Sequence, residues 1–137
     1  MNKKTIERML PQAVSALNSA GPAYSLFKNN QNEISKSYRS AISSFGAAVA
    51  MGSFRAAVAF FSKDAENGES GISRSRLLPL MYYLYKWNTT GTGVWQTAEA
   101  VCGEVLGASD ENAREMEKEF LHASVALKLA MNAFKLV

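Results

Sequence analysis

Residues 109–134 read SDENAREMEKEFLHASVALKLAMNAF, and this stretch decides the fold class. Its apolar side chains recur three and four positions apart, at Ala113, Met116, Phe120, Ala123, Leu127, Ala130 and Phe134. This spacing places them on one face of a helix. Ser109 can cap the start of that helix, where the helix dipole also favours the negative charges of Asp110 and Glu111. We therefore expect a helix from about residue 109 to the C-terminus, with one long apolar seam.

Helical spacing also dominates the rest of the chain, and signals for strands are nearly absent. Clusters of glycine, proline, asparagine and serine divide the sequence into about six helical segments. Besides the last one, we expect helices over about 4–20, 33–51, 54–64 and 94–106, and a helix that begins near Ser75 and includes Trp87. These segments predict an all-α fold over residues 1–137, a single compact helical bundle of about five to six helices.

Two of these helices form a hairpin with a tight connection at Gly52-Ser53. The apolar stripe of the first is Ile34, Tyr38, Ile42, Phe45 and Val49, and that of the second is Phe54, Val58 and Phe61. The helix after them carries leucines and the aromatic residues Tyr82, Tyr83, Tyr85 and Trp87 almost all round. A helix of this kind lies in the middle of a bundle or at an interface.

Composition and charge narrow the class of protein. Apolar residues make up 47% of the chain and charged residues 20%, which is typical of a globular protein. The first residues lack the apolar core of a secretion signal, no segment reaches the ~20 apolar residues of a membrane span, and a single cysteine excludes an internal disulfide. The cytoplasm is therefore the expected location, with no membrane association.

The residues that metal sites and catalytic triads require are too few. The chain has one histidine, His122, and one cysteine, Cys102, on separate predicted helices. The carboxylates of residues 110–119 alternate with Arg114 and Lys118, which indicates a solvated helix face. We therefore expect no enzymatic activity, no metal, no cofactor and no small-molecule substrate. A small helical enzyme would require His122 or these carboxylates to converge in a pocket.

Positive charge is concentrated in the first half of the chain. Residues 1–63 carry eight basic and two acidic side chains, whereas residues 64–137 carry seven basic and ten acidic ones. The candidate phosphate contacts lie in the hairpin and at the start of the next helix: Lys36, Arg39, Arg55, Lys63, Arg74 and Arg76. Cations at such a corner can neutralise an RNA backbone without reading bases. By spacing alone, these side chains are equally compatible with an ordinary solvated surface.

The hairpin resembles the core signature of a known family, the small α-helical subunit of Cmr-type (type III-B) CRISPR effector complexes. The matching runs are Tyr38-Arg39, Phe45-Gly46, Met51-Gly52-Ser53-Phe54 and Ala59-Phe60-Phe61-Ser62-Lys63. The C-terminal run from Phe120 to Phe134 is similar to the family's final helix. That helix often carries a tryptophan and a basic pair near its end, where this chain offers Lys128 and Lys135 instead.

The resemblance implies a non-catalytic, RNA-binding subunit in antiviral defence. Copies of it would stack along a filament, beside the backbone subunits that hold the guide RNA, and would meet the large effector subunit at one end. They would line the path of the target RNA. Within the matching motif, Arg39, Arg55 and Lys63 are the implied phosphate contacts, while Lys36, Arg74 and Arg76 are candidates by location. The alternative is a helical protein-interaction adaptor with no RNA role, which the aromatic helix around Tyr82 favours.

Overall fold

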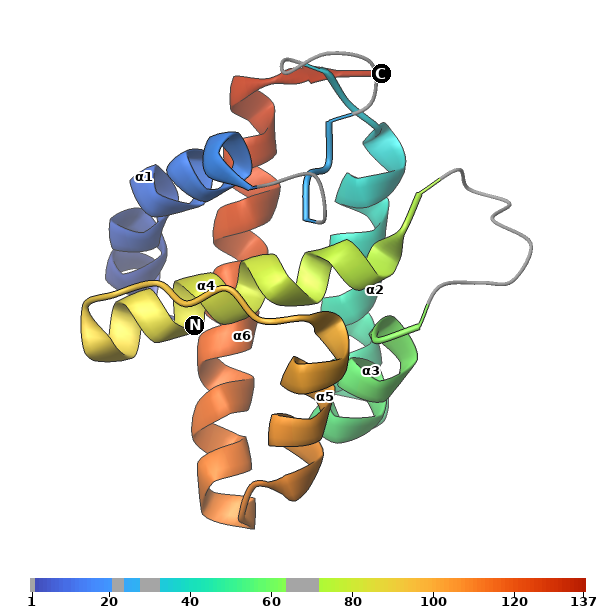
Figure 1. Ribbon diagram of the computed structural model, residues 1–137, viewed down its shortest axis with the longest axis vertical. Coiled ribbons are helices and arrows are strands. Elements are labelled where there is room, and N and C mark those ends of the chain that lie inside the picture. The colour runs from blue at the N-terminus through green and yellow to red at the C-terminus, as the bar shows by residue number, and fades with distance from the viewer. Residues whose placement is uncertain (1, 21–23, 28–32, 64–71) are drawn as a thin grey trace.

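The computed structural model describes residues 2–20, 24–27, 33–63 and 72–137 (Figure 1). Within these residues the α-helices are α1 (Lys3–Ser19), α2 (Lys36–Met51), α3 (Phe54–Phe61), α4 (Leu77–Thr90), α5 (Ala98–Gly107) and α6 (Asp110–Ala130). Short 3₁₀ turns, η1 (Arg74–Arg76) and η2 (Met131–Ala133), precede α4 and follow α6. The strands β1 (Glu33–Ile34) and β2 (Lys135–Leu136) form a two-residue parallel pair. The predicted all-α bundle is confirmed, apart from this small pair of strands.

Helix α6 runs along the long axis of the molecule and packs against α1, α4 and α2 (Figure 1). The predicted apolar seam is buried from Ala113 to Ala130. Helix α4 crosses α6, and its residues Leu77–Tyr82 are all buried, which confirms that an apolar helix lies in the middle of the bundle. Helix α1 covers another side of α6 and continues through Pro11.

Aromatic rings connect the helices in the core. The ring of Phe120, which is fully buried, meets Phe54 of α3 at 5.3 Å and Tyr85 of α4 at 5.6 Å between centroids. Phe45 of α2 meets Phe61 of α3 edge-on at 5.3 Å. These contacts bury the predicted stripes of the hairpin against α6 and α4.

Serine and threonine side chains start four of the helices. Ser35, Ser53, Thr97 and Ser109 each accept a hydrogen bond from a main-chain N–H in the first turn of α2, α3, α5 and α6. The cap predicted at Ser109 is confirmed. Helix α5 begins at Ala98 and not near residue 94, because Thr97, whose backbone is extended, forms its cap.

The threonine-rich loop between α4 and α5 has a packing role that the sequence did not indicate. Gly91 ends α4 with a positive φ of 86°, a conformation that favours glycine. A Cβ at Gly93 would lie 2.2 Å from the ring of Tyr83. The missing side chain therefore leaves room for Tyr83, whose ring packs against Trp95 at 4.5 Å.

The last helix does not run to the C-terminus as predicted. Helix α6 ends at Ala130, and β2 then pairs in parallel with β1, with Lys135 opposite Glu33 and Leu136 opposite Ile34. The N–H of Val137 donates to the carbonyl of Ile34, and the N–H of Lys36 donates to the carbonyl of Val137. The C-terminal segment thus satisfies the main chain at the start of α2, which further helical turns could not do. A two-residue strand is too short to show alternation in the sequence.

Replacing Phe120 by Ala should destabilise the protein by about 3–5 kcal/mol, because the cavity would open where α3, α4 and α6 meet. Urea unfolding followed by circular dichroism measures this difference. Leu129→Ala is the control on the same helix, since Leu129 is exposed, and its effect should stay below about 1 kcal/mol. Equal effects of the two variants would contradict a core centred on Phe120.

Candidate nucleic-acid interface

A basic pocket of about 340 Å³ lies between α2 and the C-terminal half of α6. We use the name "basic pocket" for the space lined by Lys36, Arg39, Ser40, Ser43, Lys128 and Leu136. Lys36, Arg39 and Ser43 share one face of α2, because they are three and four positions apart. Lys128 comes from α6 and Leu136 from β2, so the pocket joins segments that are far apart in the sequence.

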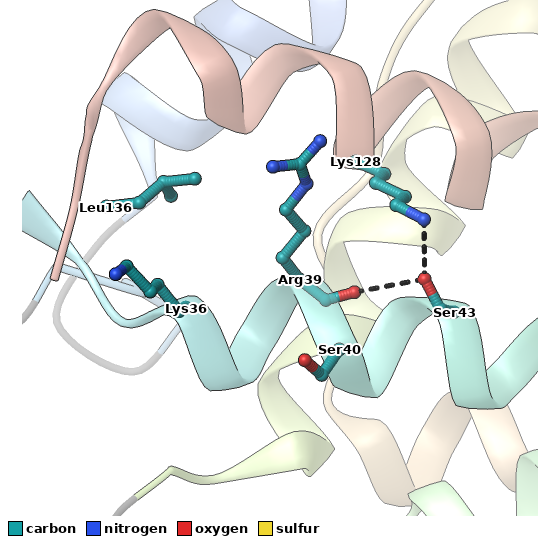
Figure 2. A pocket seen from close by; sticks show the side chains of 6 residues that line it. All are labelled: Lys36, Arg39, Ser40, Ser43, Lys128 and Leu136. Carbon is teal, nitrogen blue, oxygen red and sulfur yellow. Dashed lines mark hydrogen bonds between the residues drawn. The ribbon is translucent and has the colours of Figure 1, made fainter.

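Figure 2 shows how the side chains lie. Arg39 extends from α2 toward α6 and ends between Lys128 and Leu136. The Nζ of Lys128 donates a hydrogen bond to the Oγ of Ser43 at 2.7 Å, and this hydroxyl donates in turn to the main-chain carbonyl of Arg39 at 3.4 Å. Lys128 is therefore held on the same side of α2 as Arg39.

The charges in this pocket are all positive. Three of its lining residues are cations and none is acidic. Among the described residues, the side chains of Lys36 and Arg39 make no hydrogen bond or ion pair. Three cations that line one space create a local positive potential that attracts an anion. The open shape and the serine hydroxyls suit the oxygen atoms of a phosphate group.

Arg55, the second implied phosphate contact, lies at a different place and has partners within the protein. Its guanidinium donates to the main-chain carbonyls of Val105 and Ala108, at the end of α5. It also pairs with the carboxylate of Asp110 at 2.9 Å. Arg55 thus ties α3 to the connection between α5 and α6, and its Nε, Nη1 and Nη2 nitrogens each donate within the protein.

The other predicted cations do not join the basic pocket. Lys63 is exposed, directly after α3. Arg76 donates to the main-chain carbonyl of Ser25, in the segment after α1. The guanidinium of Arg74 lies 4.2 Å from the centroid of the Phe60 ring, on the other flank of α2. Of the six candidates, only Lys36 and Arg39 line the basic pocket.

Lys128 was not predicted as a phosphate contact. From the sequence it is a cation near the end of the last helix, 89 positions after Arg39. Spacing within one helix relates Lys36 to Arg39, but no local pattern shows that the end of α6 returns to the start of α2. The pairing of β1 with β2 establishes that proximity.

His122 is buried, with 3% of its surface exposed. Its Nε2 accepts a hydrogen bond from the main-chain N–H of Asn2 at 3.2 Å, and its Nδ1 lies 4.0 Å from a carboxylate oxygen of Glu119. Burial lowers the pKa of His122, although the charge of Glu119 opposes that shift. The neutral imidazole therefore anchors the start of α1 to α6.

The described residues contain no group of three or more His, Cys, Asp or Glu side chains arranged to hold a metal ion. None of the helices in the described part of the chain combines the length and the apolar content that a membrane crossing requires.

Comparison with known proteins identifies no relative: no family model, curated protein or solved structure matches the chain. Functional interpretation therefore depends on the chain's own residues and on the resemblance described above.

Arg55→Ala should lower the stability by about 1–3 kcal/mol, because two carbonyls at the end of α5 lose a charged donor. Thermal or urea unfolding measures the loss. The stability of Arg55→Lys should lie between those of the unmodified protein and Arg55→Ala, since an ammonium group keeps the charge but lacks the forked geometry of guanidinium. Lys63→Ala is the control, with an expected effect below about 0.5 kcal/mol at its exposed position. An Arg55→Ala variant as stable as the unmodified protein would contradict the tying role.

Proposed function

We propose that this chain is a non-catalytic small subunit of a type III-B (Cmr) CRISPR ribonucleoprotein. It would stack along the filament, beside the backbone subunits and next to the large effector subunit, and would help to hold the target RNA and the guide duplex for antiviral interference. The observation that supports the RNA role is the basic pocket, which Lys36, Arg39 and Lys128 line and no acidic side chain lines. The proposed family is based on the resemblance of residues 38–63 to the Cmr small subunit.

The chemistry of the basic pocket supports a role in positioning the RNA strand and not in cutting it. Lysine and arginine bind phosphate oxygens without regard to base identity, so they fix a strand in place and leave sequence recognition to base pairing. The buried imidazole of His122 is engaged by the start of α1. No step of bond cleavage is therefore assigned to this chain.

Exposed apolar side chains at opposite ends of the molecule support the stacking of copies. Met51 ends α2 and Leu106 lies in the last turn of α5, whereas Leu129 lies in the last turn of α6. Helices α2 and α5 end at the lower end of Figure 1, and α6 ends at the upper end. A head-to-tail contact would cover the apolar groups of both ends, and such contacts propagate into filaments.

The adaptor alternative loses part of its support. The aromatic residues that favoured it pack against the chain's own rings: Tyr83 against Trp95, and Tyr85 against Phe120. Tyr82 is buried. The aromatic content of α4 is thus used largely within the bundle, and the adaptor reading keeps only the exposed apolar residues in its favour.

The combined change of Lys36, Arg39 and Lys128 to Ala should weaken binding of single-stranded RNA and flatten its salt dependence. Each lost phosphate contact lowers the slope of log K against log salt by about 0.7, so the slope should fall by roughly 2. Fluorescence anisotropy with a short labelled RNA, measured from low to moderate salt, gives both quantities. The control variant changes Lys4, Arg114 and Lys118 to Ala, which removes the same charge from exposed positions elsewhere. If both variants behave alike, net charge and not the pocket determines binding.

A tagged chain recovered from its native host should co-purify with the larger CRISPR effector subunits and with short RNAs that share a repeat-derived end. Mass spectrometry and RNA sequencing identify these components. High salt should release target RNA from the tagged chain more readily than protein partners, because the phosphate contacts are electrostatic. Recovery of protein partners without RNA would favour the adaptor alternative and would contradict the proposed family.

A further inference from the structure

A second pocket, of about 310 Å³, lies on the other flank of α2 and is not used by the proposed phosphate contacts. Its walls combine the hydroxyls of Ser37, Ser40 and Ser44 with the ring of Phe60 and the guanidinium of Arg74. We call it the aromatic pocket. It is less open and more apolar than the basic pocket, as a site for a planar ring would be.

Phe60 and Arg74 form a stacked pair in this pocket, with the guanidinium over one face of the ring. Phe60 exposes 60% of its surface, which is unusual for a phenylalanine in the second half of a packed helix. Its ring is braced by the buried Phe61 at 5.8 Å and by the guanidinium of Arg74 at 4.2 Å. The Nε of Arg74 is buried and has no hydrogen-bond partner among the described residues. Aromatic rings and guanidinium planes are the surfaces on which unpaired bases stack.

The two pockets are neighbours, because Ser40 lines both of them. In Figure 2 Arg39 extends toward α6, whereas the hydroxyl of Ser40 lies on the opposite side of α2. At 3.6 residues per turn, the face with Lys36 and Ser43 and the face with Ser37 and Ser44 lie about a third of a turn apart. A nucleotide likewise carries its phosphate and its base on two sides of one sugar.

We propose that the aromatic pocket binds the base of an unpaired RNA nucleotide whose phosphate lies in the basic pocket. This inference rests on the proposed function and adds its ligand chemistry: an unpaired nucleotide of the target RNA, since a base within the guide duplex is already stacked and paired. Serine hydroxyls both donate and accept hydrogen bonds, so they satisfy the edge of any of the four bases. Binding should therefore depend on the presence of a base and little on its identity.

The test compares a short single-stranded RNA with the same strand made of abasic residues, which has the same phosphate charge. The unmodified full chain should bind the RNA roughly tenfold more tightly than the abasic strand, since one stacked base contributes a factor of about 5 to 150. Phe60→Ala should abolish this preference and leave the salt slope unchanged. Arg74→Lys should reduce the preference in part, because it keeps the charge and loses the plane.

Gln96→Ala is the matched control, because it removes another exposed side chain at a site that lines neither pocket, and it should keep the preference. Circular dichroism of each variant establishes that the fold is intact. A preference retained in Phe60→Ala, or equal affinity of the unmodified chain for both strands, would overturn the base site while leaving the phosphate contacts in place. Binding of neither strand, even at low salt, would contradict the proposed function itself. Loss of a co-purified protein from Phe60→Ala, with RNA affinities unchanged, would assign the pocket to protein docking and overturn the proposal.

Discussion

The fully buried ring of Phe120 lies where α3, α4 and α6 meet, and the arrangement of the bundle depends on the apolar face to which it belongs. Burial of that face along α6 holds α1 and α4 on its sides and the α2–α3 hairpin beside them. Because an apolar seam of this length must be covered along its whole extent, the shorter helices can take few other positions. Lys128 lies on α6 outside this buried face, where it lines the basic pocket together with residues of α2.

The proposed RNA site depends on a smaller set of contacts, the hydrogen bonds that join the segment before α2 to the C-terminal segment. Parallel pairing of β1 with β2 fixes the start of α2 next to the end of α6. Lys36 and Arg39 thereby face Lys128, and the Ser43 hydroxyl links the two helices. Like charges repel, so three cations remain together only where the backbone holds them in place. The packing of the chain supplies that arrangement before any anion binds.

The spacing of apolar residues predicted the features that depend on neighbouring residues. The helices, their buried stripes and the cap at Ser109 follow from spacing within a few turns, and Ile34, Phe45 and Phe61 are buried as expected. The start of α5, the end of α6 and the strand pair were not predicted, because they depend on contacts between distant segments. The same limit explains Arg55. Its position at the start of α3 was correct, whereas its partners at the end of α5 are fifty positions away and cannot be read from neighbouring residues. Lys128 was missed for the same reason, because its place in the basic pocket depends on the contact between the end of α6 and the start of α2.

The strand pair also bears on the order in which the molecule forms. Glu33 and Lys135 are about one hundred positions apart, so closing this contact costs more chain entropy than forming the α2–α3 hairpin, whose partners are close in sequence. Contacts between distant residues tend to form late during folding. We expect the hairpin and its aromatic packing to assemble early, and the basic pocket to close only after the segment that follows Ala130 has paired with β1. Newly made protein would therefore acquire its shape before its affinity for an anion.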